Sequence, residues 1–280
     1  KAGDEITLDG TQGEVLCGAP DTLEPLLDAT FQKLMDWAEQ TADIGIRANA
    51  DTPADAQTAR NFNAHGIGLC RTEHMFFDPS RLTVMREMIF ADTSEGRRAV
   101  LDRLLPMQRE DFIQLFRIMQ GQPVCIRLFD PPLHEFLPAS RSGQRDLAEA
   151  LDLPLSNVTR RIEAMSEYNP MLGLRGVRLG VTVPEIYEMQ ARAIFEATIE
   201  ASRDGEPVVP EIMIPLVSAK REVELVKASV DKIATAVRSE RGATFTYRLG
   251  VMVETPRAAL RAGEIAPYCS FLSFGTNDLT

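Results

Sequence analysis

The chain has 280 residues, enough for one large domain or for one domain with an appendage. Apolar residues make up 44% and charged residues 25%, as in an ordinary soluble globular protein, and 30 basic against 41 acidic residues give a net charge of −11. This charge argues against nucleic acid or an anionic membrane surface as a partner, and no apolar run is long enough for a membrane span or a signal peptide.

The first 43 residues differ from the rest of the chain. The stretch DEITLDGTQGEVLCG alternates apolar and polar residues around two glycine-containing turns, which predicts a β-hairpin within residues 1–20. The hairpin is too short to be a domain and is typical of the end of one that lies upstream. An amphipathic helix is predicted from Thr22 to Thr41, so that residues 21–43 form a linker helix.

From residue 44 onward, apolar segments alternate with helix patterns. Most of these segments are apolar at consecutive positions, which is typical of parallel strands that are covered on both faces. Seven strands are predicted, over residues 44–50, 66–73, 124–130, 172–176, 211–217, 248–255 and 271–278.

Two of the intervening helices have clear patterns. The segment 218–237 carries a valine-rich stripe, with Ser218 as its predicted N-cap, and the segment 183–197 places Pro184 at a first helical position. The long stretch 131–169 has no strand pattern and is predicted to be a loop excursion with a helix over 158–165.

Repeated strand–helix units favour either a (β/α)8 barrel or a doubly wound open sheet. Nearly every predicted strand carries a charged or amide residue at its C-terminal end, and a barrel gathers these ends on the face that holds its active site. Neither glycine-rich nucleotide-binding fingerprint occurs in the sequence. We therefore predict an α/β fold of the (β/α)8 TIM-barrel type over residues 44–280, truncated after its seventh strand.

Three arginines stand at predicted strand ends: Arg71, Arg127 and Arg175. Each alone could pair with a structural carboxylate at the barrel rim. Three of them at one rim favour a small anion with several oxygens, phosphate above all, because the planar guanidinium group matches such oxygens with paired hydrogen bonds.

Two carboxylates, Glu254 and Asp278, end the sixth and seventh predicted strands. Neighbouring carboxylates either take up a proton or share a cation, and Mg²⁺ is the natural cation for oxygen ligands beside a phosphate. Alternatively, Glu254 caps the helix that starts near Pro256 while Asp278 pairs with an arginine. The three histidines are interpreted as solvated or supporting residues, and Cys70 and Cys125 as core thiols.

Several longer motifs resemble those of the pyruvate, phosphate dikinases within the family of phosphoenolpyruvate (PEP)-utilising enzymes. The likeness covers essentially the whole chain, and its motifs are GIGLCRTEHMFF, LLPMQREDF, IRLFDPPLHEFLP, YNPMLGLRGVRLG, PEIYEMQARAIFEA, EIMIPLV, GVMVETPRAAL and FLSFGTNDLT. The run RLFDPPLHEFLP is more typical of the dikinases than of PEP synthase or of the first enzyme of the sugar phosphotransferase system. The residues 1–20 resemble the end of the family's swivelling phosphohistidine domain.

The resemblance implies specific roles for residues of the predicted barrel. Arg71, Arg127 and Arg175 would hold the phosphoryl group, with Asp130 orienting Arg127 or a neighbour. The remaining implied positions are Glu254 and Asp278 as Mg²⁺ ligands, and Asn277 with the backbone of Gly275 and Thr276 as contacts for substrate oxygens. One departure is Leu174, where a histidine is expected before Arg175.

The same resemblance implies a phosphotransferase that interconverts pyruvate and PEP with Mg²⁺. The phosphohistidine, the nucleotide-binding domain and an eighth strand with a catalytic cysteine would lie outside these residues, so that the fragment alone is expected to be inactive. The alternatives are a PEP synthase-like enzyme, a truncated non-catalytic PEP-binding module, and a lyase of the same barrel type. A homodimer in the cytoplasm is expected, with reduced cysteines.

Overall fold

The structure is a computed structural model that describes residues 2–21, 28–203 and 205–279. Its contacts divide the chain into two compact units, Lys1–Gly45 and Ile46–Thr280. We describe each unit by itself. Among the described helices, none combines the length with the apolar character that a membrane crossing requires.

The first unit contains a hairpin and a helix. Strands β1 (Ile6–Asp9) and β2 (Glu14–Cys17) pair in antiparallel fashion, as the alternating pattern predicts. Helix α1 (Ala29–Thr41) begins where the Asp28 side chain accepts a hydrogen bond from the backbone N–H of Phe31 at 2.7 Å. The first part of the predicted helix, residues 22–27, lies outside the described residues. No residue of α1 is buried, and Trp37, the single tryptophan of the sequence, is exposed.

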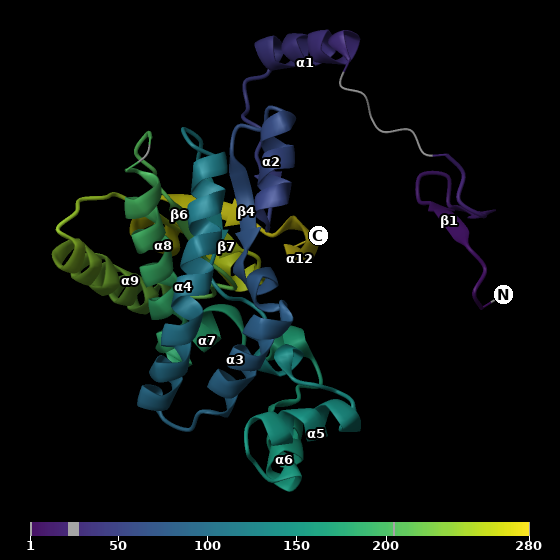
Figure 1. The fold of residues 1–280 in the computed structure, drawn as a ribbon. Coiled ribbons are helices and arrows are strands. Elements are labelled where there is room, and N and C mark those ends of the chain that lie inside the picture. The colour runs from purple at the N-terminus through teal and green to yellow at the C-terminus, as the bar shows by residue number, and fades with distance from the viewer. Residues whose placement is uncertain (1, 22–27, 204, 280) are drawn as a thin grey trace. The chain divides into compact units, whose positions relative to one another are not determined.

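The second unit is built on a parallel sheet of six strands, which curls as Figure 1 shows. Its order is β3-β4-β5-β6-β7-β8, so the strands follow one another in chain order. The strands are β3 (Ala48–Asn49), β4 (Ile67–Arg71), β5 (Val124–Arg127), β6 (Glu211–Ile214), β7 (Arg248–Val253) and β8 (Phe271–Phe274). In the described residues, β3 and β8 are the two edges of this sheet, which is therefore an α/β half-barrel and not a closed ring.

The strand predicted over residues 172–176 is wrong. That segment contains the 3₁₀ turn η3 (Pro170–Leu172) and leads into helix α7 (Gly176–Thr182), and β5 pairs directly with β6. The segment nevertheless lies between these strands at their C-terminal ends, because Gly176 N–H donates to Asp130 O at 2.7 Å and Val177 N–H donates to Pro215 O at 3.1 Å.

Helices cover the outer face of the sheet. Helix α4 packs against α8, which packs against α9, and these three lie along one side of the sheet in Figure 1. The helices are α2 (Pro53–Asn61), α3 (Pro79–Phe90), α4 (Ser94–Ile118), α5 (Arg141–Ala150), α6 (Leu155–Met165), α7, α8 (Pro184–Ala201), α9 (Lys220–Arg241), α10 (Pro256–Leu260), α11 (Ala262–Ile265) and α12 (Thr276–Leu279). The short 3₁₀ turns η1 (Thr72–Phe76), η2 (Leu133–Phe136) and η4 (Ala266–Tyr268) complete the unit.

Two predicted helices are confirmed with small differences. Helix α8 starts at Pro184 as predicted, and α9 buries the predicted valine stripe. Ser218 is not the N-cap of α9, because Ala219 precedes the helix and the Glu222 carboxylate accepts the N–H groups of Ser218 and Ala219 at 2.7 and 2.9 Å. The excursion 131–169 contains α5 as well as the expected α6, and both lie apart from the sheet (Figure 1).

The two faces of the sheet differ in what they bury. Alternate strand residues such as Ile126, Ile212 and Val251 join the main core beneath the helices. Residues of the opposite, inner face form a small separate cluster of Cys125, Met213 and Met252. Because side chains alternate along a strand, Arg127 shares the inner face with Cys125, two residues before it. The inner face of the sheet therefore carries a small apolar cluster, and Arg127 follows it at the C-terminal end of β5.

Candidate functional site

The C-terminal ends of the parallel strands bring the predicted site residues to one edge of the sheet. Arg71 ends β4 and Arg127 ends β5, and the two are partners in the register of these adjacent strands. Arg175 directly precedes α7, which begins beside the ends of β5 and β6. The three arginines that the sequence places far apart therefore meet at one edge.

Asp130 lies between two of these arginines. Its Oδ2 atom is 3.1 Å from Arg127 Nη1 and 2.6 Å from Arg175 Nη2. Asp130 is only 2% exposed, so its carboxylate is shielded from solvent and the two guanidinium groups compensate its negative charge. We call Arg127, Asp130 and Arg175 the arginine–aspartate cluster.

Arg127 has a second acidic partner, Glu73, whose Oε1 atom accepts a hydrogen bond from Arg127 Nη2. Burial by itself lowers the pKa of Arg127, but the charges of Glu73 and Asp130 outweigh it and raise that pKa above its ordinary value. Arg127 is thus a permanent cation whose position two carboxylates determine.

Arg71 is held by a different carboxylate. Asp51, which follows β3, accepts hydrogen bonds from the backbone N–H of Arg71 at 2.7 Å and from its Nη1 at 3.1 Å. The same carboxylate lies 2.9 Å from His74 Nδ1. His74 therefore lies beside the site as a neighbour of Arg71.

Glu254 follows β7 and is tied to the end of β6. Its Oε1 atom accepts the backbone N–H of Leu216 at 2.6 Å, and Leu216 adopts a left-handed backbone with φ of 57°. The alternative in which Glu254 caps the next helix is wrong, because Thr255 caps α10 through its Oγ1 atom. Burial and then the charge of Asp130 raise the pKa of Glu254 above its ordinary value.

The second predicted metal ligand, Asp278, reaches the same place from α12. A Cβ atom at Gly275 would lie 3.3 Å from both Glu254 Oε2 and Asp278 Oδ2, so these two oxygens border one small volume. The charge of Asp278 also contributes to the raised pKa of Glu254. Thr276 and Asn277 lie beside Asp278 in α12, and both are solvent-exposed.

Several polar atoms of this site are buried without a hydrogen-bond partner in the part of the chain that the structure describes. They are Glu73 Oε2, Arg127 Nε, Asp130 Oδ1 and Arg175 Nε. Buried polar groups are normally paired, and exceptions point to a missing water, ion or ligand. Four such atoms in and beside the arginine–aspartate cluster make this edge the candidate site.

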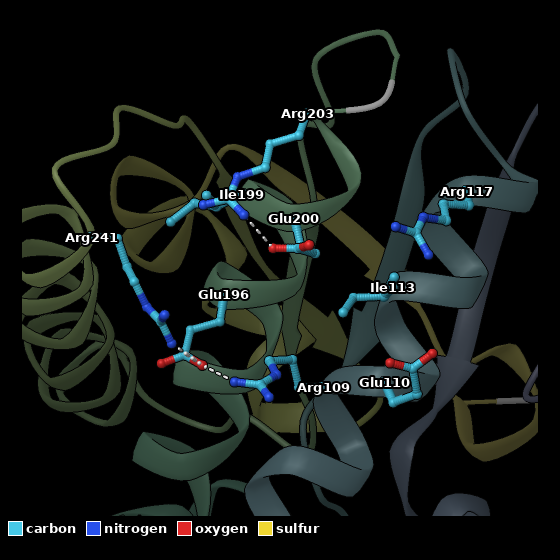
Figure 2. Close-up of a pocket in the computed structure, with 9 residues that line it drawn as sticks. All are labelled: Arg109, Glu110, Ile113, Arg117, Glu196, Ile199, Glu200, Arg203 and Arg241. Atoms are coloured by element: carbon cyan, nitrogen blue, oxygen red, sulfur yellow. Dashed lines mark hydrogen bonds and ion pairs between the residues drawn. The ribbon is translucent and has the colours of Figure 1, made fainter.

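A cavity of about 350 Å³ lies elsewhere, among α4, α8 and α9 (Figure 2). In it Arg109 and Arg241 both pair with Glu196, at 2.7 and 3.0 Å. Three of its arginines stand at or just past the C-terminal ends of these helices, at positions 117, 203 and 241, where cations complement the negative end of the helix dipole. We interpret this cavity as structural.

The two strand cysteines are core thiols as predicted. Cys70 and Cys125 are both buried, and burial raises the pKa of Cys125 to about 12. Such a thiol stays protonated near neutral pH and is a poor nucleophile.

Comparison with known proteins identifies the family of the chain. The model of the PEP-binding domain of PEP-utilising enzymes matches residues 27–280. The chain belongs to the PEP-utilising enzyme family. Three similar curated proteins are each named pyruvate, phosphate dikinase: those of Rhizobium meliloti (strain 1021), Giardia intestinalis and Clostridium symbiosum.

The match covers nearly all of this chain but only part of each relative. The identities are 53%, 51% and 46% in the order just given, over 100%, 100% and 99% of this chain. The chain spans 31% to 32% of the length of these relatives. The resemblance to the dikinases of the PEP-utilising family is therefore confirmed, and the alternatives of a PEP synthase-like enzyme, a lyase or a non-catalytic module are not favoured.

The resemblance implied Asp130 as a partner of Arg127, and the structure pairs the two. Sequence reasoning missed two further acidic partners, Glu73 of Arg127 and Asp51 of Arg71, because these pairings cross between elements. Leu216 donates its backbone N–H to the Glu254 carboxylate. No sequence pattern predicts this contact, because it does not depend on the Leu216 side chain.

Proposed function

We propose that this chain is the substrate-binding part of a pyruvate, phosphate dikinase, which binds pyruvate or PEP at the carboxyl edge of the sheet. In the whole protein, a phosphoryl group would move between a phosphohistidine of another domain and pyruvate held here. The observation that carries the proposal is the buried arginine–aspartate cluster beside Glu254, whose unpaired N–H groups fit the oxygens of a phosphoryl group.

The charge balance of the site supports a divalent cation. Three arginines face five carboxylates (Asp51, Glu73, Asp130, Glu254 and Asp278), which leaves two negative charges when all are ionised. These two negative charges would repel an anionic substrate unless a cation compensated them. Glu254 and Asp278 would hold Mg²⁺, because their oxygens border one volume and Mg²⁺ needs only one or two carboxylates beside substrate oxygens. In the described residues no three His, Cys, Asp or Glu side chains form such a site, so this pair would act with the substrate.

The residues divide the proposed chemistry between them. Mg²⁺, when bound, would draw electron density from the oxygens of pyruvate and ease transfer of a methyl proton to a base, the cysteine that the resemblance implies on an eighth strand outside these residues. Arg127 and Arg175, with Arg71 beside them, would hold the phosphoryl oxygens as the phosphorus–nitrogen bond to histidine breaks and a phosphorus–oxygen bond to the enol oxygen forms. Asn277 and the backbone of Gly275 and Thr276 would contact the substrate carboxylate or the phosphoryl oxygens.

Calorimetric titration with PEP, with and without Mg²⁺, tests this assignment. We expect binding that requires Mg²⁺ and that weakens at least about tenfold in Arg127→Lys, because lysine cannot form the paired contacts of a guanidinium group. Arg109→Lys, in the cavity of Figure 2, is the matched control and should bind as the native chain does. Mg²⁺-independent binding, or equal affinities for the two variants, would refute the proposal.

Some features of the whole enzyme belong to the same proposal. Residues 1–20 would be the end of the phosphohistidine domain, residues 21–43 the linker, and residues 44–280 the larger part of an eight-stranded barrel. A homodimer and a cytoplasmic location remain predictions. Sedimentation of the purified full-length protein would test the dimer.

A further inference from the structure

Helix α8 holds the residue that precedes Asp130. Tyr187 Oη donates a hydrogen bond to Phe129 O at 2.9 Å, and Gln190 Oε1 accepts the Phe129 N–H at 2.8 Å. Both side chains are at most 1% exposed. Positions 187 and 190 share one face of the helix because they are three residues apart. One helix face therefore satisfies both backbone groups of Phe129.

The Phe129 side chain is fixed as well. Its ring lies 5.9 Å from that of Phe76 and 5.4 Å from that of Phe136, measured between centroids, and the residue is fully buried. With its ring and its backbone both held, Phe129 leaves Asp130 little freedom to move. Asp130 in turn determines the positions of Arg127 and Arg175.

Tyr187 also contacts the element that carries Arg175. Its ring lies so close to Gly180 of α7 that a Cβ atom there would be 2.2 Å from Tyr187 Cε2. Helix α7 begins one residue after Arg175. Tyr187 therefore acts on the cluster by two routes, through Phe129 to Asp130 and through α7 to Arg175.

A purely structural role would be to satisfy the backbone where β5 ends. Gln190 serves that role imperfectly, because among the described residues its buried Nε2 atom has no hydrogen-bond partner. An unpaired buried donor costs free energy. This cost fits a role in which the exact position of the Phe129 peptide matters.

We propose that Tyr187 and Gln190 are positioning residues that hold the arginine–aspartate cluster in its binding geometry. The inference rests on the proposed function, since that cluster is the proposed phosphoryl site. Small displacements of such groups have large effects, because paired hydrogen bonds to an anion demand close alignment.

Nitrogen-15 NMR of the arginine side chains tests the inference directly. The signals of Arg127 and Arg175 are assigned from the spectra of Arg127→Lys and Arg175→Lys. In Tyr187→Phe, which removes one oxygen atom, both signals should shift or broaden. Tyr247→Phe is the matched control, because the Tyr247 hydroxyl bonds to Asp231 on another part of the unit and its loss should leave both signals unchanged. Gln190→Met provides a second variant should Tyr187→Phe fold poorly.

PEP affinity in the presence of Mg²⁺ gives the functional measurement. We expect it to fall about 3- to 10-fold in Tyr187→Phe and in Gln190→Met, and to stay unchanged in Tyr247→Phe. Unchanged Arg127 and Arg175 signals in both folded variants would overturn the inference. A native chain that does not bind PEP would count against the proposed function, while the arginine spectra would still decide whether α8 positions the cluster.

Discussion

Glu254 carries its carboxylate where its surroundings oppose ionisation. Burial and the charge of Asp130 raise its pKa, and the Leu216 N–H and Arg127 act in the opposite direction without cancelling the effect. A carboxylate that is costly to ionise among its protein neighbours is suited to bind a cation, because the cation would remove that cost. Proton and Mg²⁺ should therefore compete at Glu254.

This competition predicts a pH dependence of stability in the metal-free chain. A raised pKa in the folded state means that the contribution of Glu254 to stability is full below about pH 4.3, the ordinary pKa of glutamate, and is lost as the pH rises through the raised pKa. Glu254→Gln has no carboxyl group to titrate at this position. The unfolding free energy of this variant minus that of the native chain should therefore increase as the pH rises from about 4.3 through the raised pKa of Glu254, as measured by urea unfolding.

The exposed Glu200 supplies the control for that experiment. Glu200→Gln removes a carboxylate whose ion pair with Arg203 lies at the surface, away from the sheet edge, and it is measured alongside Glu254→Gln. A difference between Glu254→Gln and the native chain that does not change with pH would contradict the prediction. Mg²⁺ affinity, measured separately, should rise with pH in the native chain through the same range.

Gly275 lies directly against Glu254. A Cβ atom there would lie 2.6 Å from Glu254 Cβ, closer than atoms can approach. Gly275→Ala should therefore displace Glu254, lower the unfolding free energy by about 1–3 kcal/mol and weaken Mg²⁺-dependent PEP binding about tenfold. Gly263→Ala is the matched control, since nothing lies within 4 Å of its added Cβ. Calorimetry and urea unfolding of both variants would check it, and equal behaviour would contradict the steric argument.

Residue types at strand ends could be predicted from the sequence. Of their pairings, only that of Asp130 with Arg127 was expected, and it was expected from the resemblance. Apolar segments ending in Arg71 and Arg127 suffice to place both arginines at one edge, because parallel strands share that edge. Glu73 stands two residues after Arg71 yet pairs with Arg127, because the 3₁₀ turn η1 redirects the chain there. Such a change of direction has no clear sequence pattern.

Helix α8 is the element that links the site to the outer layer. One face carries Tyr187 and Gln190, and farther along the helix Glu196 accepts contacts from Arg109 of α4 and Arg241 of α9 (Figure 2). Although burial opposes it, hydrogen bonds from Arg109 and Arg241 lower the pKa of Glu196. The stability that Glu196 provides is therefore present above the ordinary glutamate pKa and is lost as the pH falls through the lowered one.

Replacing Glu196 should loosen the three helices together. We expect Glu196→Ala to lower the unfolding free energy by about 1–3 kcal/mol, below the figure for a fully buried pair because the arginines are partly exposed. Glu200→Ala, four residues later on the same helix, should cost at most about 1 kcal/mol. Thermal or urea unfolding compares the two variants. Similar losses of unfolding free energy would show that Glu196 does not stabilise the packing of the three helices more than Glu200 does.

The segment 172–176 shows where reasoning about single elements fails. Its apolar run and its terminal arginine are typical of a strand, and Arg175 does reach the predicted edge. The segment instead wedges between the ends of β5 and β6, where Gly176 adopts φ of 55°. A Cβ atom at Gly176 would lie 2.7 Å from Leu216 Cβ, so only glycine lets the backbone here pack this closely against Leu216. The apolar pattern of residues 172–176 gives no indication of this contact.

For the molecule as a whole, the first unit should add little to the stability of the second. No described residue before Ala48 belongs to or packs on the hydrophobic core clusters. A chain that begins at Ile46 should therefore unfold with a midpoint within about 2 °C of that of residues 1–280 when circular dichroism follows the main transition. A markedly lower midpoint would show that residues 1–45 stabilise the sheet.

The broad architecture was predictable because it depends on repeated patterns. Strand and helix periodicities along residues 44–280 predict a parallel α/β fold, and six of the seven expected strands are present. Closure into a ring depends on how edge strands meet, and in the described residues β3 and β8 remain edges. The hairpin was equally predictable from its local alternation.

The position of Trp37 on the exposed α1 has a practical consequence for spectroscopy. All four tyrosines, at positions 168, 187, 247 and 268, belong to the other unit. Light absorbed only by indole would therefore report on helix α1, whereas the phenol signal would report on the second unit. The chain carries a separate optical reporter for each of its two units, with no added label.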